Sequence, residues 1–172
     1  MDQFSTPLAD ALLEQVKHEY IPYDVPGHKG NLPPMSDYFG EKLLLLDKNS
    51  RAGIDYLCNP RGVIREAQAL AADAFGVEQA FFMIGGTTSS VQAMVMCACA
   101  PGEKIIIPRN VHYSVINAVI LAGAVPVYIS PQVHPRIGIS LGMCTDDVRE
   151  CIKSNPDAKA ILVNNPTYYG DY

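Results

Sequence analysis

The chain has 172 residues, of which 48% are hydrophobic and 18% are charged, and its formal net charge is −5. This length suits one ordinary domain with a sizeable core, and the composition excludes a disordered chain. The acidic balance argues against a nucleic-acid partner, and no segment is long and apolar enough to predict a membrane span. Because the N-terminus also lacks the pattern of a signal peptide, we expect a soluble cytoplasmic protein.

The cysteines predict neither a disulfide framework nor a metal site. There are five of them, an odd number, and they lack the paired short spacings of a zinc site. Cys97 and Cys99 lie two apart on a predicted helix, so their side chains point in different directions. We therefore expect inert thiols and no bound metal.

The first part of the chain is polar and punctuated by prolines. A helix is predicted over Pro7–Tyr20, with Thr6 as the N-cap and Pro7 at the first helical position. Prolines from Pro22 to Pro34 then predict an extended, loop-rich path. A second helix is predicted over Arg61–Phe75, with Gly76 as its stop. We interpret residues 1–60 as an N-terminal helix-and-loop arm and residues 61–172 as the start of a major domain.

From Ala80 onward, strands and helices alternate. The predicted strands are Ala80–Ile84, Lys104–Pro108, Ala124–Ser130 and Lys159–Asn164, and the predicted helices are Thr88–Cys99, His112–Ala122 and Thr145–Ser154, the last capped by Thr145. Continuous apolar strands separated by helices indicate an α/β fold, with a mostly parallel sheet and helices on both faces.

Ligands of such sheets bind at the carboxyl ends of the strands. The loops expected there are Gly85–Ser90, Arg109–Ser114, Ser130–His134 and Asn164–Gly170, and we expect them to share one rim. No Gly-Lys-Ser/Thr phosphate loop and no G-x-G-x-x-G fingerprint is present, which disfavours nucleoside triphosphate and dinucleotide binding.

The segment Gly85 to Ser90 predicts an anion site. It follows an apolar run, turns at two glycines and opens a helix with four hydroxyl residues. Free backbone N–H groups and the helix dipole at Gly86, Thr87 and Thr88 suit a phosphate-sized anion. The alternative is an ordinary helix cap after a flexible turn.

His112 follows the next predicted strand and opens the next predicted helix. An aromatic ring there would stack on a planar cofactor whose phosphate lies at Gly86 to Thr88. The alternative is a helix-start histidine that hydrogen-bonds the backbone. No second ligand stands at a spacing that would complete a metal site with His112.

Five motifs, in one order along nearly the whole chain, resemble the ornithine/lysine/arginine decarboxylases. They are Pro26-Gly27-His28-Lys29-Gly30, Gly62-Val63-Ile64-Arg65-Glu66-Ala67-Gln68, Gly86-Thr87-Thr88, Pro108-Arg109-Asn110-Val111-His112 and Asn165-Pro166-Thr167-Tyr168-Tyr169-Gly170. The family consists of pyridoxal-phosphate enzymes of the aspartate-aminotransferase fold, fold type I. The resemblance implies that residues 61–172 are the front portion of the large domain of that fold.

The resemblance also assigns roles to site residues. It implies that Gly86, Thr87 and Thr88 hold the phosphate of pyridoxal 5′-phosphate, that His112 stacks on the pyridine ring, and that Thr167 lies near the edge of the ring. Two positions depart from the family pattern: Gly85 and Val91 stand where the family has asparagine. The local polar network is therefore expected to be thinner here.

Two essential family residues have no counterpart in this chain: the aspartate at the pyridine nitrogen and the Schiff-base lysine. The sequence is therefore interpreted as a truncated or split decarboxylase that contains no catalytic residue. The resemblance implies a basic amino acid substrate, and either a homo-oligomer or a complementary C-terminal segment as partner. Two alternatives remain open: another fold type I enzyme, such as an aminotransferase or carbon–sulfur lyase, and a non-catalytic remnant.

The resemblance carries an expectation about folding as well. In that fold the strand corresponding to Ala80–Ile84 is separated from the others by later strands. Without those strands we expect unpaired edges and an uncovered apolar face.

Overall fold

The computed structural model describes residues 1–18 and 21–171. The chain divides between Phe82 and Met83 into two compact units, which we call the helical unit (Met1–Phe82) and the sheet unit (from Met83 onward). Each unit is described by itself. The domain boundary that the sequence predicts after residue 60 stays a prediction.

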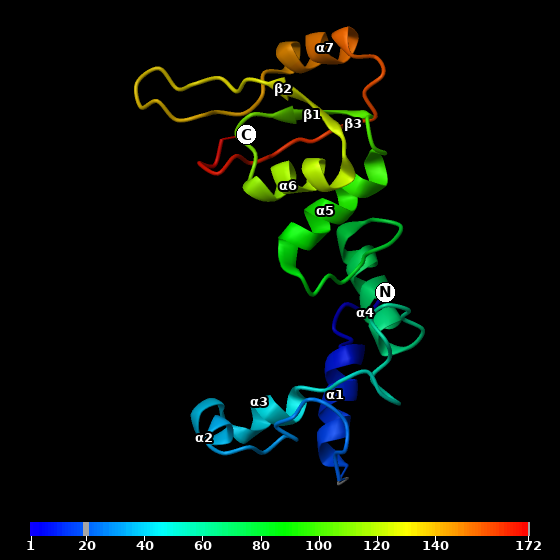
Figure 1. The fold of residues 1–172 in the computed structure, drawn as a ribbon. Coiled ribbons are helices and arrows are strands. Elements are labelled where there is room, and N and C mark those ends of the chain that lie inside the picture. Colours follow the sequence, from blue (N-terminus) through cyan, green and yellow to red (C-terminus); the bar gives the residue numbers. More distant parts are fainter. Residues whose placement is uncertain (19–20, 172) are drawn as a thin grey trace. The chain divides into compact units, whose positions relative to one another are not determined.

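The helical unit contains α1 (Pro7–Lys17), α2 (Met35–Phe39), α3 (Glu41–Leu46) and α4 (Val63–Phe75) (Figure 1). Helices α1 and α4 confirm the two predicted helices, and Gly76 ends α4 in the left-handed conformation as expected. Helix α1 ends at Lys17, and the last two residues predicted for it, 19 and 20, lie outside the described residues. The half-buried Leu8, Leu12 and Val16 recur every fourth residue, and α1 packs against α3 and α4.

Two short helices correct the prediction that the prolines impose only an extended, loop-rich path. Pro34 is the N-cap of α2, and α3 follows after Gly40. A proline suits the start of a helix because it has no N–H to leave unpaired there. Leu44 of α3 is buried, so packing against α1 stabilises a helix too short to be stable in isolation.

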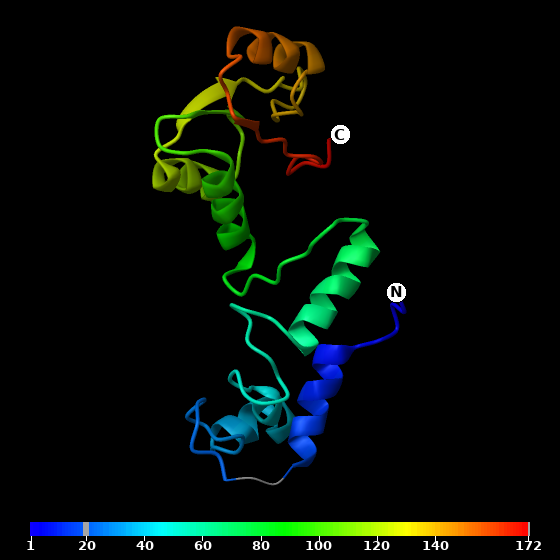
Figure 2. The same cartoon turned by 90° about the vertical axis from the view of Figure 1, so that its right-hand side faces the viewer.

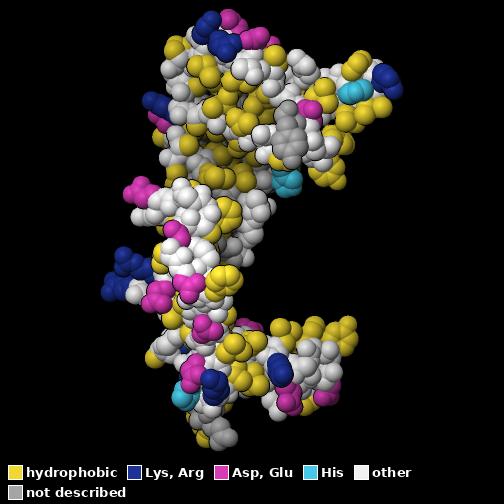
Figure 3. All heavy atoms as spheres, turned by 180° about the vertical axis from the view of Figure 1, so that it is seen from behind, with side chains coloured by type: hydrophobic (Ala, Val, Ile, Leu, Met, Phe, Trp, Pro, Cys, Tyr) yellow, Lys and Arg dark blue, Asp and Glu magenta, His cyan; other side chains and the backbone are white. Residues whose placement is uncertain are grey.

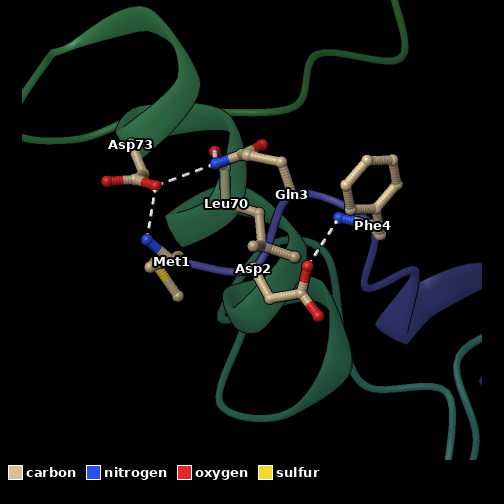
Figure 4. Close-up of polar contacts among 6 residues, drawn as sticks. All are labelled: Met1, Asp2, Gln3, Phe4, Leu70 and Asp73. Atoms are coloured by element: carbon tan, nitrogen blue, oxygen red, sulfur yellow. Dashed lines mark hydrogen bonds and ion pairs between the residues drawn. The ribbon is translucent and has the colours of Figure 1, made fainter.

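The first residues of the chain are held against α4 by polar contacts. The N-terminal ammonium of Met1 lies 2.8 Å from Asp73 Oδ2, and the Gln3 side-chain amide donates to the same oxygen at 2.8 Å (Figure 4). That amide also donates to the carbonyl of Leu70 at 3.2 Å. The hydrogen bond from the ammonium, followed by that from Gln3, lowers the pKa of the Asp73 carboxyl below its usual value.

The start of α4 is held by a carboxylate from outside the helix. Asp55 accepts hydrogen bonds from the backbone N–H groups of Tyr56, Arg61, Gly62 and Ile64, at donor–acceptor distances of 2.7–3.2 Å. These bonds, that from Arg61 first, hold the pKa of Asp55 well below its usual range. The Asp55 side chain therefore does for α4 what an N-cap residue does in other helices, since Gly62 at the N-cap has no side chain.

The sheet unit contains α5 (Gly86–Ala98), β1 (Lys104–Pro108), α6 (Tyr113–Ala122), β2 (Val125–Ile129), α7 (Thr145–Ser154) and β3 (Ala160–Ile161). Its three strands form a parallel sheet in the order β2-β1-β3. In Figures 1 and 2, α7 lies on one side of the sheet, and α5 and α6 lie on the other. The predicted parallel sheet with helices on both faces is therefore present.

The core of the sheet unit sits between β1 and the pair α5 and α6. Ile105 and Ile107 pack there with Val95 of α5 and Val115 of α6. Ile106 is also buried, and it points to the opposite face because side chains alternate along a strand. A strand covered on both faces explains the continuous Ile-Ile-Ile run in the sequence.

The predicted strand Ala80–Ile84 is wrong. The structure forms no strand there, and its ladders join only β1, β2 and β3 in the described part of the chain. Phe81 is 72% exposed and Ile84 is 91% exposed, so the apolar run does not become a buried strand. A strand is stable only when its backbone groups pair with a neighbour, and none of the described strands pairs with this segment.

Other element boundaries differ by smaller amounts. Helix α5 begins at Gly86, two residues before the prediction, and α6 begins one residue after it, at Tyr113. The N-cap of α7 is Cys144, and the predicted cap Thr145 is the first helical residue. Strand β3 pairs with β1 over only two residues of the six predicted.

Candidate functional site

The two helices that carry the predicted site residues, α5 and α6, pack against each other in the sheet unit. The Gly102 N–H, just after α5, donates to the Gly123 carbonyl, just after α6, at 2.8 Å. Both helices therefore end beside the start of β1, and α5 contributes Val91, Val95 and its C-cap Cys99 to the core. Helix α6 starts at the carboxyl edge of the sheet, where ligands of parallel sheets bind, because His112 follows the end of β1 by four residues. In Figure 2, α5 leads away from the sheet toward its start, so its first turn is not placed at that edge.

The first turn of α5 leaves its backbone donors free. Gly86 has a φ of +72°, a left-handed conformation that suits glycine, and no side chain caps the helix. Thr87 and Thr88 are exposed, and among the described residues their hydroxyls make no hydrogen bond. The hydroxyls of Ser89 and Ser90 instead bond back to the carbonyls of Gly85 and Gly86. An exposed, uncapped helix start with two unused hydroxyls fits a phosphate group.

The absence of a side chain at Gly85 leaves room for the hydroxyl of Ser89. A Cβ atom at position 85 would lie 2.0 Å from Ser89 Oγ, so a larger residue would displace that hydroxyl from its bond to the Gly85 carbonyl. Glycine at this position, where the family pattern has asparagine, is thus locally compatible with the serine four residues later.

His112 is the N-cap of α6. Its Nδ1 accepts a hydrogen bond from the Ser114 N–H at 3.1 Å and lies 2.8 Å from Ser114 Oγ. A ring nitrogen that accepts from an N–H carries no proton, so in the neutral ring the proton is on Nε2. The backbone contact anticipated as the alternative is therefore present. It fixes one edge of the ring while leaving the residue exposed.

Thr167 is buried in a tight turn. Its Oγ1 accepts from the Asp171 N–H at 3.1 Å, and its own N–H donates to the Asp171 carbonyl at 2.9 Å. The Asp171 carboxylate in turn accepts from the Gly142 N–H at 2.6 Å. The hydroxyl of Thr167 thus orders the loop after β3 in this structure.

The lysines of the sheet unit lie at the amino edge of the sheet, where the strands begin. Lys104 begins β1 and pairs with Asp157 at 3.1 Å, and Lys159 precedes β3 and lies 3.6 Å from Glu103. Lys153 is in the last turn of α7, which leads to the start of β3. In this unit, no described lysine is therefore placed at the carboxyl edge.

Sequence reasoning missed the contacts that connect the loops of this edge. The Asn110 side chain donates to the Leu141 carbonyl at 3.3 Å, and Asp171 reaches Gly142 across 29 positions. The Arg109 guanidinium lies 5.2 Å from the centre of the Tyr128 ring, a cation–π contact. Nothing local in the sequence signals these partners.

The part of the chain that the structure describes shows neither a metal-ligand cluster nor a membrane-spanning helix. Among residues 1–18 and 21–171, no group of three or more His, Cys, Asp or Glu side chains is arranged to hold a metal ion. None of the helices in these ranges has both the length and the apolarity to cross a membrane.

A small parallel sheet between helix layers, with an N-cap histidine at its carboxyl edge, defines a mixed α/β protein. The family model described as Orn/Lys/Arg decarboxylase, major domain, matches residues 6–172. The chain belongs to this family.

Similar proteins agree with this assignment. The chain is 44% identical to an arginine decarboxylase of Bacillus cereus and 41% identical to one of Bacillus subtilis, over 99% of its length in both cases. It covers 38% and 35% of those two relatives, so it spans little more than a third of their length. The solved structure of the constitutive lysine decarboxylase of Escherichia coli matches with a TM-score of 0.77 and 27% identity, over 96% of this chain and 26% of that one.

Proposed function

We propose that this chain supplies the phosphate-binding part of a pyridoxal-phosphate-dependent decarboxylase of basic amino acids, with the large-domain fold of fold type I. The observation that carries the proposal is the exposed, uncapped start of α5, where the hydroxyls of Thr87 and Thr88 make no hydrogen bond among the described residues. The family membership and the names of the relatives, arginine and lysine decarboxylase, support the reaction and the substrate class.

The residues present fit the phosphate end of the cofactor. Its phosphate would accept hydrogen bonds from the N–H groups of Gly86, Thr87 and Thr88 and from the two threonine hydroxyls. When bound, pyridoxal phosphate supplies an electron sink for the electrons left by departing carbon dioxide. The chain's own task is to bind and orient this group, with His112 as a wall beside the ring and Thr167 holding the loop near its edge.

The described lysines favour a second candidate function for the chain by itself, which is binding without catalysis. All three lysines of the sheet unit lie at the amino edge of the sheet. We propose that the complete site takes its lysine from a further segment or a second chain. Exposed apolar side chains on the helices of the sheet unit, including Met94, Met96, Ile120 and Leu121, support such a partner. Hydrophobic side chains also cover much of the face of this unit seen in Figure 3.

The test is the affinity of the purified chain for pyridoxal phosphate, followed by absorbance. Replacing Thr88 with Val removes one charge-assisted hydrogen bond, worth about 1.5–3 kcal/mol, so the dissociation constant should rise about 10- to 150-fold. The matched control is Thr145→Val, which removes an exposed hydroxyl from the first position of α7 and should leave the affinity unchanged. Equal affinities of the Thr88→Val variant and the unmodified chain would refute the assignment of the phosphate site.

A further inference from the structure

The ring of His112 receives two contacts from one buried residue. Ser114, the second residue of α6, is only 4% exposed. Its backbone N–H donates to His112 Nδ1 at 3.1 Å, and its Oγ lies 2.8 Å from the same nitrogen. In the part of the chain that the structure describes, Nδ1 is the one partner of this hydroxyl. Because buried hydroxyls need a hydrogen-bond partner, the Ser114 hydroxyl is committed to the ring.

Two other histidines of the chain show what this hydroxyl adds. His28 Nδ1 accepts from the Gly30 N–H at 3.0 Å. His134 Nδ1 accepts from the Arg136 N–H at 3.3 Å. In both cases, as at His112, the donor is the backbone N–H two residues further along the chain, but neither glycine nor arginine brings a hydroxyl to Nδ1. His112 therefore has a second attachment that the local backbone geometry does not supply.

Serine hydroxyls at a helix start have another partner available, which Ser114 does not use. At the start of α5, the hydroxyls of Ser89 and Ser90 bond to the carbonyls of the residues four positions before them. Among the described residues, Ser114 Oγ makes no such bond to the backbone. Since the Ser114 N–H requires an unprotonated Nδ1, the hydroxyl is the donor in its own contact with that nitrogen.

The two contacts fix the orientation and the tautomer of the ring. Rotation of an imidazole about χ2 has only a broad preference of its own, so its contacts decide the orientation. Turning the ring over would replace Nδ1 with a carbon and leave a buried hydroxyl without an acceptor, which is costly. In the neutral ring the proton is therefore on Nε2. The structure gives Nε2 no partner among the described residues, so this N–H can donate to a ligand.

We infer that Ser114 is a positioning residue for His112. Its hydroxyl holds the ring in one orientation, with the face of the ring and its Nε2–H ready for a ligand at the carboxyl edge of the sheet. A ring that is already fixed loses little conformational freedom when a planar ligand stacks on it. The fixed ring rests on the structure alone, whereas pyridoxal phosphate as the ligand rests on the proposed function.

The first experiment measures the order of the histidine rings in the purified chain without ligand, by carbon-13 NMR relaxation of their Cδ2–H groups. The ring of His112 should be more ordered than that of His134, which has the backbone bond alone. In Ser114→Ala the order of the His112 ring should fall to the level of His134, and Ser114→Thr, which restores a hydroxyl, should recover it. The control is Ser154→Ala, which removes an exposed hydroxyl at the end of α7 and should change nothing.

The second experiment measures the binding of pyridoxal phosphate and of inorganic phosphate to the same variants. Ser114→Ala should raise the dissociation constant of pyridoxal phosphate about 3- to 10-fold, the effect of one neutral hydrogen bond. It should leave that of inorganic phosphate unchanged, because this anion lacks the ring. In a His112→Asn background, where asparagine can still cap α6, Ser114→Ala should have no further effect. An effect that requires the ring distinguishes positioning from general support of the fold.

A His112 ring that is equally ordered in Ser114→Ala and in the unmodified chain would overturn the inference. A proton on Nδ1 of the neutral ring, read from long-range proton–nitrogen correlation spectra, would do the same. So would an unmodified chain whose His112 ring is no more ordered than that of His134, a result that requires no variant to fold. Failure to bind pyridoxal phosphate, with the ring ordered as expected, refutes only the proposed function.

Discussion

Truncating Ile107 to alanine should strongly destabilise the sheet unit. Ile107 belongs to β1's buried run, is 0% exposed, and packs against α5 and α6. The change removes three carbon atoms from the core, which costs about 2.4 kcal/mol at roughly 0.8 kcal/mol per buried carbon. Because the strand is held by partners on both faces, the site cannot collapse fully, and the cavity left behind adds to this cost. We therefore expect about 3–5 kcal/mol.

The assay is urea denaturation followed by circular dichroism, with a graded series of variants. Ile107→Val, which removes one carbon, should cost only about 0.5–1.5 kcal/mol. Ile137→Ala is the control, since Ile137 is 65% exposed and its truncation should change the free energy of unfolding by less than about 0.5 kcal/mol. A cost below about 1 kcal/mol for Ile107→Ala, at an unchanged denaturant slope, would mean that β1 is not the centre of a packed core.

Two further predictions concern Asp55 and turnover. The native pKa of Asp55 lies below its unfolded value, so its contribution to stability is present above about pH 4 and is lost as the pH falls toward the native pKa. Asp55→Asn should lower the thermal midpoint at pH 7 and make it depend less on pH between about 5 and 2; an unchanged pH profile would contradict this role. The purified chain, incubated with pyridoxal phosphate and lysine, arginine or ornithine, should release no more carbon dioxide than free cofactor does, because the lysines of its sheet unit lie at the amino edge. Turnover above that background would show that one of the present lysines serves the reaction.

The elements with strong local signals were predictable from the sequence. Strand β1 was predicted with its observed bounds, because an uninterrupted isoleucine run between a lysine and a proline is typical of a buried parallel strand. Helices α4 and α6 were predicted to within two residues, because each combines an apolar periodicity with a glycine at its end. The parallel α/β fold follows from the alternation of such elements, and the family from the order of its motifs.

The sequence misled where an element depends on a neighbour. The run Ala80–Ile84 has the composition of a strand but no strand to pair with, so composition alone gave the wrong result. Conversely, α3 is shorter than an isolated stable helix, and the burial of Leu44 and the packing of α3 against α1 support it. In both cases the deciding interaction lies outside the segment.

The predicted site residues also divide into those with a local signal in the sequence and those that depend on a distant partner. The hydroxyl-rich start of α5 and the histidine at the start of α6 were recognisable locally, because capping and anion binding use the residues of a single turn. The carboxylates of Asp55 and Asp171 were not recognisable. Their partners, the N–H groups of Ile64 and Gly142, lie nine and 29 positions away. The sequence alone determined which turns carry free donors and hydroxyls. Only the tertiary structure decided which distant carboxylate each loop receives, because such a bond forms only after packing has brought the two segments together.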